Sequence, residues 1–63
     1  MNDVQIIKSI MVNDYYIVFK DSERKGSIKR DKGKYLLTLY YKVNFKAYFA
    51  TLTDAMQYAK EML

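Results

Sequence analysis

Lysine and tyrosine side chains recur at alternate positions in the second half of the chain, and they are the residues best suited to bind a partner. Ammonium groups attract phosphates and carboxylates, while tyrosine rings add large contact surfaces with a hydroxyl at the edge. Alternate residues of an extended strand lie on the same side of a sheet. The positions that follow this pattern are Lys34, Thr38, Tyr40, Lys42, Lys46 and Tyr48. They predict a basic surface with aromatic rings between the cations.

The residue types needed for most small-enzyme chemistry are missing from the sequence. There is no cysteine and no histidine, which excludes disulfides, thiol nucleophiles, imidazole bases and the usual zinc ligands. The acidic residues fall in expected turns or on the expected helix surface, and no spacing forces two of them together. Gly26 and Gly33 are interpreted as isolated turn glycines rather than a phosphate-binding loop. We therefore expect a protein that is not an enzyme, with no catalytic residue, metal or cofactor.

The positive charge of the chain is concentrated in one segment. Eleven Lys and Arg residues against seven Asp and Glu give a net charge of +4, and most of the excess lies between residues 20 and 34. Such a local field favours nucleic acid, an acidic protein surface or a membrane headgroup layer, although a solvated turn has the same composition. Polar residues at positions 8, 13, 20 and 42 interrupt the apolar runs. We expect a cytoplasmic protein with no signal peptide, membrane span or membrane partner.

The first 22 residues predict a β-hairpin that extends the sheet. Val4–Val12 shows partial alternation, with a helix as the competing interpretation, and Tyr15–Lys20 is rich in aromatic and β-branched residues. Asn13-Asp14 between them tolerates left-handed backbone, which suits a tight turn. The polar segment Asp21–Gly26 predicts a turn or short loop.

Residues 26–63 predict a basic unit of three strands and one helix. Alternation is strongest in the middle strand, and Thr51 or Thr53 stands where a helix N-cap belongs. The predicted strands are Ser27–Arg30, Lys34–Tyr41 and Phe45–Ala50, with turns at 31–33 and 42–44.

These patterns predict one small α+β domain over residues 1–63. Its antiparallel sheet has four to five strands, and the C-terminal helix packs on one face. The expected apolar stripe of the helix consists of Leu52, Ala55, Met56, Ala59 and Leu63. The expected sheet residues beneath it are Tyr35, Leu37, Leu39, Tyr41, Phe45 and Phe49. The opposite face stays uncovered, and Lys29 joins it if the short strand keeps the assumed register.

Short motifs in residues 26–63 resemble those of a known DNA-binding family. The motifs are Gly26-Ser27-Ile28, Gly33-Lys34-Tyr35, Phe49-Ala50-Thr51 and the alanines from Ala55 to Ala59. In this segment the chain resembles the arm-binding domain of phage and transposon integrases and the related domain of plant ethylene-response factors. The resemblance implies a three-stranded sheet whose open face enters the DNA major groove. The chain departs from the family in having no tryptophan and few arginines, which favours phosphate contacts over base-specific readout.

We expect from these observations a small DNA-binding protein of a phage or mobile element, with duplex DNA as its partner. The alternative is a small phage-type interaction protein that binds and inhibits or redirects a host protein, and a homodimer is compatible with either function. In the alternative, the contact surface is the tyrosine-rich face or the strand with Ile6, Ile7, Ile10 and Met11. In the DNA-binding function, the expected phosphate contacts are Lys29, Arg30, Lys34, Lys42 and Lys46, and the expected groove contacts are Thr38, Tyr40 and Tyr48.

Overall fold

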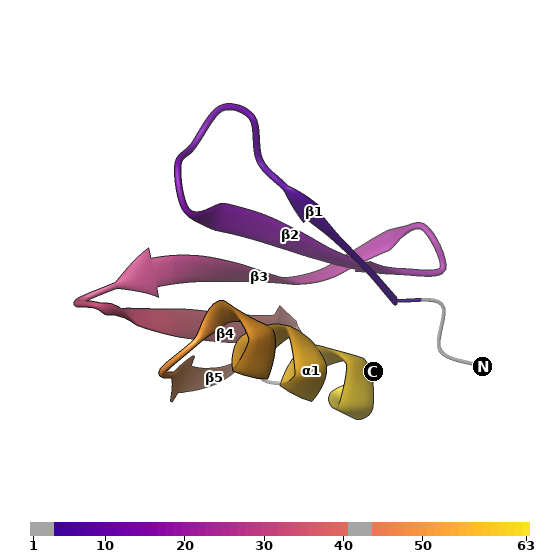
Figure 1. Cartoon of the computed structure of the whole chain (residues 1–63). Helices are drawn as coiled ribbons and strands as arrows, with labels where there is room; N and C mark the ends of the chain where they lie inside the picture. The colour runs from indigo at the N-terminus through magenta and orange to yellow at the C-terminus, as the bar shows by residue number, and fades with distance from the viewer. Residues whose placement is uncertain (1–3, 41–43) are drawn as a thin grey trace.

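The chain folds into a five-stranded antiparallel sheet followed by one helix, in a computed structural model that describes residues 4–40 and 44–63 (Figure 1). Each strand pairs with the next one in sequence, so the sheet order is β1-β2-β3-β4-β5. The predicted α+β class is confirmed, and the helix contacts β4 and β5. The elements are β1 (Val4–Lys8), β2 (Tyr15–Lys20), β3 (Glu23–Asp31), β4 (Lys34–Tyr40), β5 (Asn44–Phe49) and α1 (Leu52–Met62).

Within the described ranges, no helix has the length and apolar character needed to cross a bilayer. The predicted core residue Tyr41 and the predicted site residue Lys42 lie outside the described residues.

The first strand is shorter than predicted and ends at Lys8 rather than at Val12. The hydroxyl of Ser9 accepts hydrogen bonds from the backbone N–H groups two and three residues later, both at 3.2 Å. A side chain that binds nearby backbone groups competes with strand pairing. A loop at 9–14 therefore replaces the predicted two-residue turn, and Ile10 and Met11 lie in this loop rather than in a strand.

The connection between β2 and β3 is much tighter than the predicted loop. Asp21 and Ser22 both have left-handed backbone, with φ of 52° and 67°, and such a two-residue turn matches the twist of the flanking strands. As a result β3 begins at Glu23, and Gly26 is a strand residue instead of a turn residue. A Cβ at Gly26 would lie 2.2 Å from the carbonyl oxygen of Thr38 on β4, so only glycine allows the two strands to approach this closely.

A two-residue turn also joins β3 to β4. Lys32 and Gly33 have φ of 55° and 79°. The turn contains one residue fewer than predicted, because β3 runs on to Asp31 while β4 begins at Lys34 as predicted. The register assumed for this hairpin is confirmed, because Lys29 is directly opposite Leu36.

The helix begins as predicted and buries its small residues against the sheet. Thr51 is the N-cap, and its hydroxyl accepts a hydrogen bond of 3.1 Å from the backbone N–H of Asp54. Ala55 and Ala59 are fully buried, because their small side chains let the helix lie close to the strands. The buried apolar cluster consists of Val18, Ile28, Leu37, Leu39, Ala55 and Ala59.

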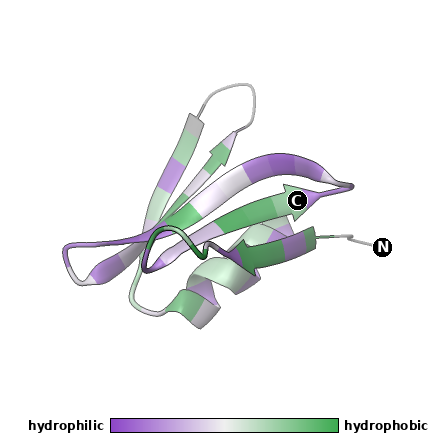
Figure 2. Cartoon of the chain, turned by 90° about the horizontal axis from the view of Figure 1, so that it is seen from above, coloured by the Kyte–Doolittle hydropathy of each residue, from purple (hydrophilic) through white to green (hydrophobic). Residues whose placement is uncertain are grey.

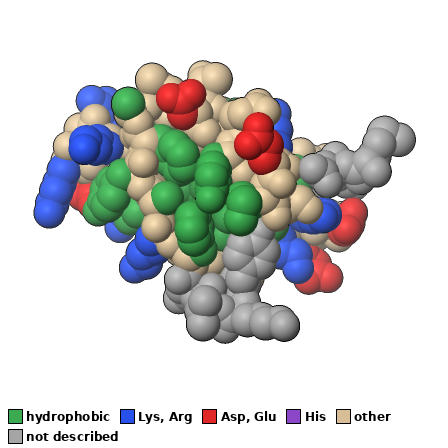
Figure 3. All heavy atoms as spheres, turned by 90° about the horizontal axis from the view of Figure 1, so that it is seen from below, with side chains coloured by type: hydrophobic (Ala, Val, Ile, Leu, Met, Phe, Trp, Pro, Cys, Tyr) green, Lys and Arg blue, Asp and Glu red, His purple; other side chains and the backbone are tan. Residues whose placement is uncertain are grey.

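Aromatic side chains close the seam between α1 and the outer strand β5. The ring of Tyr58 stacks on Phe45 with centroids 5.8 Å apart, and it lies tilted against Phe49 at 5.2 Å. The prediction that Phe45 and Phe49 face the helix is confirmed, whereas the role of Tyr58 was not predicted. Figure 3, which views the molecule from the side of α1 and β5, shows apolar side chains in one continuous area with Lys and Arg at its margin.

The N-terminal hairpin contributes to the same core. Val4, Ile6 and Tyr16 are half-buried and pack against the buried cluster from β1 and β2. Because Ile6 points to the core, Ile7 points to the opposite side of the sheet, where it is 51% exposed. We call the sheet face on this opposite side, which α1 does not cover, the open face.

Candidate functional site

The register of the sheet determines which predicted residues share the open face. Residues directly opposite each other in neighbouring strands lie on the same face. One row across the sheet runs from Tyr15 through Lys29 and Leu36 to Tyr48. The next row consists of Ile7, Ile17, Ser27, Thr38 and Lys46. The two rows show that the open face is mainly apolar over β1 and β2 and carries lysines on β3 and β5.

Three of the five lysine and arginine residues predicted to bind phosphate lie on the open face. Lys29, Lys34 and Lys46 are all exposed, and none of the three ammonium groups has an ion-pair partner among the residues that the structure describes. Their charges are therefore available to an anionic ligand without first breaking an internal pair. Lys42 lies outside the described residues.

Arg30 does not lie on the open face. It is opposite Tyr35, which packs against the core on the helix side of the sheet. Successive strand residues point to opposite faces, so Lys29 and Arg30 cannot both contact a ligand bound flat on one face. The grouping of Arg30 with the other predicted phosphate contacts is therefore not supported by the register.

The predicted groove contacts all lie on the open face, with Tyr40 and Tyr48 toward opposite ends of the β4–β5 pair. Tyr48 and Tyr40 are 52% and 41% exposed, and Thr38 is half-buried between Ser27 and Lys46. Two exposed rings on a face that also carries lysines can stack on planar groups or pack against apolar ones.

A shallow hollow of about 380 Å³ lies at the β3–β4 end of the open face, lined by Asp31, Lys32, Lys34 and Tyr48. The Tyr48 hydroxyl donates a hydrogen bond of 2.9 Å to the Asp31 carboxylate. This hydrogen bond and, secondly, the carboxylate charge raise the pKa of Tyr48 above its ordinary value, because both favour the neutral phenol. The hollow therefore presents the ammonium groups of Lys32 and Lys34 beside the Asp31 carboxylate, which already accepts a hydrogen bond from Tyr48.

Arg24 is an open-face residue that the sequence analysis did not include. Its guanidinium donates a hydrogen bond of 2.7 Å to the Tyr15 hydroxyl and lies 5.9 Å from the centre of the Tyr40 ring. The register between β2 and β3 shifts after Val18, and this irregularity changes which β3 residues face outward. Sequence alternation alone could not place Arg24 on this face, because the prediction put it in a loop.

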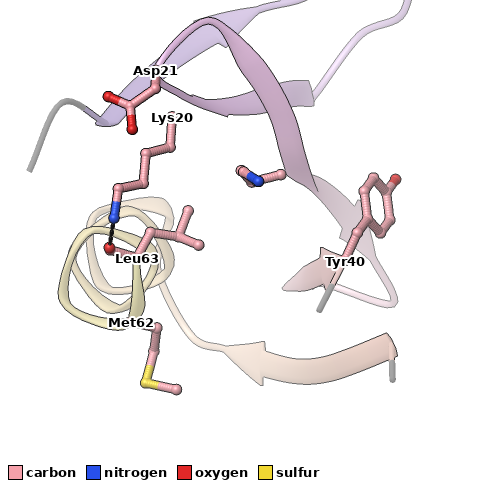
Figure 4. Close-up of a pocket in the computed structure, with 6 residues that line it drawn as sticks. Lys20, Asp21, Tyr40, Met62 and Leu63 are labelled. Carbon is pink, nitrogen blue, oxygen red and sulfur yellow. Dashed lines mark hydrogen bonds between the residues drawn. The ribbon is translucent and has the colours of Figure 1, made fainter. Parts of the chain in front are cut away.

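A second hollow, of about 300 Å³, lies at the other end of the sheet near the end of α1. Figure 4 shows Lys20 reaching from β2 toward the helix end, where its ammonium group donates a hydrogen bond to the Leu63 carbonyl oxygen. A cation at the C-terminal end of a helix is favourable because the carbonyl groups there are partially negative. This contact has a structural explanation, so we do not assign the second hollow to ligand binding.

The described residues contain no group of three or more acidic, cysteine or histidine side chains that could hold a metal ion. The chain matches no protein-family model, and comparisons with curated proteins and with solved structures return no match. The open face therefore has to be interpreted from its own chemistry.

Proposed function

We propose that the chain is a small DNA-binding protein that holds duplex DNA against the basic half of its open face. The observation that carries this proposal is the arrangement of Lys29, Lys34 and Lys46, which are exposed, unpaired within the described chain and on one face. Lysines bind phosphates as point charges, so this arrangement suits contacts to the DNA backbone more than readout of particular bases.

The resemblance to integrase arm-binding domains supports the same proposal. It implies three strands followed by a helix, with the ligand on the sheet face opposite the helix, and β3, β4, β5 and α1 follow that order. Tyr40 and Tyr48 are then the candidate groove contacts beside the phosphate-binding lysines.

The test compares single alanine variants in a fluorescence-anisotropy titration of mixed-sequence duplex DNA over a range of salt concentrations. Each of Lys29→Ala, Lys34→Ala and Lys46→Ala is expected to weaken binding on every sequence and to reduce the salt slope by about one unit. Arg30→Ala is the matched control, because it removes the same charge from the helix side of the sheet. Equal losses for Arg30→Ala and the three lysine variants, or no binding at low salt, would refute the proposed use of this face.

A second candidate function is binding of a protein partner, and the apolar half of the open face favours it. Ile7, Ile17 and Phe19 belong to this half, where Ile7 is exposed and Ile17 and Phe19 are half-buried. An exposed apolar area beside cations fits a partner whose own surface is apolar with an acidic rim. An Ile7→Ser variant that loses a pulled-down host protein while keeping its DNA affinity would favour this second function.

A further inference from the structure

The loop between β1 and β2 carries three consecutive apolar side chains that are open to solvent. Ile10, Met11 and Val12 are 96%, 88% and 53% exposed, and we call these three residues the apolar tip. Figure 1 shows the loop arching away from the sheet and the helix, and Figure 2 colours it as hydrophobic while the neighbouring β3–β4 turn is hydrophilic. Single exposed apolar residues are common, but a contiguous group on a projecting loop indicates an interaction site.

The backbone of this loop is fixed at both ends. At its start, Ser9 donates its backbone N–H to the Tyr15 carbonyl oxygen at 2.8 Å, and its hydroxyl accepts two N–H groups from within the loop. At its end, the Asp14 carbonyl oxygen accepts a hydrogen bond of 3.1 Å from the backbone N–H of Arg30 on β3. A loop held in this way presents its apolar side chains with less ordering cost on binding than a loop without such contacts.

Three exposed cations surround the base of the loop, and we call them the basic collar. Lys8 ends β1 immediately before the loop, and Arg30 forms the backbone contact at the loop's other end. Lys29 lies opposite Tyr15, the first residue after the loop. Lys29 belongs to the open face and Arg30 to the helix side, so the collar extends over both faces. Two described acidic residues lie nearby: Asp14 is exposed, and the half-buried Asp31 accepts a hydrogen bond from Tyr48. The three cations are therefore in excess over the described carboxylates.

We propose that the apolar tip inserts into the surface of an anionic lipid bilayer while the basic collar binds the lipid headgroups. These three residues belong to a loop rather than to a helix or strand, so they present no periodic apolar row. Fluid hydrocarbon accepts apolar groups in any arrangement, and a negatively charged headgroup layer attracts cations located beside them. The charge of the collar therefore favours an anionic bilayer over a purely apolar partner.

This inference does not depend on DNA binding. The tip lies in the β1–β2 loop, whereas Lys34 and Lys46 of the proposed DNA site lie on β4 and β5. Lys29 belongs to both proposed sites, so the tip variant is the change that separates them. The sequence-based expectation of no membrane partner relied on interrupted apolar runs, and interruption excludes a membrane span but not the peripheral insertion of a short loop.

Tryptophan fluorescence gives a direct measure of insertion. The chain contains no tryptophan, so Met11→Trp introduces a single reporter at the tip. We expect its emission to shift to shorter wavelength with vesicles of phosphatidylcholine and phosphatidylglycerol, and not with phosphatidylcholine alone. An unchanged emission spectrum with the mixed vesicles would contradict insertion.

Vesicle sedimentation then tests the two parts of the proposed site. The double variant Ile10→Ser with Met11→Ser is expected to bind the mixed vesicles at least about 100-fold more weakly, because two apolar side chains lose their transfer into lipid. Lys29→Gln with Arg30→Gln is expected to lose roughly 30-fold. Met62→Ser is the matched control, since it removes a 44% exposed methionine at the opposite end of the fold, and it should bind like the wild type.

Several results would overturn the proposal. Wild-type protein that fails to sediment with the mixed vesicles would do so, as would a double tip variant that binds them as tightly as the wild type. Light scattering gives a further check, because a wild-type dimer that the tip variant converts to a monomer would assign the tip to a second copy of the chain. Circular dichroism of each variant confirms that its fold is intact.

Discussion

Replacing Gly26 with alanine tests the closest approach between strands in this fold. The new Cβ would lie 2.2 Å from the Thr38 carbonyl oxygen and 2.9 Å from a Leu39 methyl group. The first of these contacts is with backbone, so β3 and β4 must separate locally, and we expect a cost near the top of the overpacking range, about 3 kcal/mol. A domain of 63 residues has a total free energy of unfolding of about 3–9 kcal/mol. The variant should therefore lose a third or more of its stability, and its Tm should fall by roughly 12–24 °C.

Urea unfolding followed by circular dichroism measures this loss, and Gly33→Ala is the matched control. Gly33 has φ of +79°, and apart from its chain neighbours no described residue has a heavy atom within 4 Å of an added Cβ. Its alanine variant therefore experiences mainly the left-handed backbone penalty, about 1–2 kcal/mol. Gly33→Asn should recover part of that penalty, because asparagine tolerates this conformation. A smaller loss for Gly26→Ala than for Gly33→Ala would refute the close contact between β3 and β4.

Two further predictions concern the helix start and the hollow on the open face. Thr51→Ala removes the N-cap hydroxyl and should lower the free energy of unfolding by about 1 kcal/mol in the same urea assay. Thr53→Ala, an exposed change in the first turn, should stay within about 0.5 kcal/mol of wild type, and equal effects of the two variants would contradict the cap. Asp31→Asn removes the charge that helps to raise the pKa of Tyr48, so that pKa should fall in an NMR titration of the tyrosine ring carbons. The raised pKa of Tyr48 in the folded state means that its hydrogen bond stabilises the wild type fully below the ordinary tyrosine pKa. This stabilisation is lost as the pH rises through the pKa of the folded state. An unchanged Tyr48 pKa in Asp31→Asn would refute the role of Asp31.

The parts of the fold that local patterns control were predictable from sequence. Alternation in residues 34–40 correctly separated the core residues Leu37 and Leu39 from the outward Lys34 and Tyr40. The position of a hydroxyl before an amphipathic segment limited the N-cap to Thr51 or Thr53, and the structure shows that it is Thr51. Both features depend on neighbouring residues in the chain, so a single sequence contains the necessary information.

The errors arose where a distant contact decides the local structure. Gly26 ends a polar segment, which is typical of a turn, and only the nearby Thr38 carbonyl group on β4 explains why a glycine lies within β3. The register shift after Val18 likewise placed Arg24 on the open face. Arg30 is a different case, because strand alternation already separates it from its neighbour Lys29 and the sequence interpretation had grouped the two by charge.

The strictly consecutive order of the strands has a consequence for how the chain folds. Every strand pair joins neighbours in sequence, so the three connections that the structure describes, at 9–14, 21–22 and 32–33, can close early at little entropic cost. Folds with mostly local contacts reach the native state quickly. Docking of α1 onto β4 and β5, with the contact between Lys20 and Leu63, brings together the most widely separated parts of the chain. We therefore expect the strand hairpins to be formed in the transition state for folding, and the C-terminal end of α1 to dock on the sheet after it.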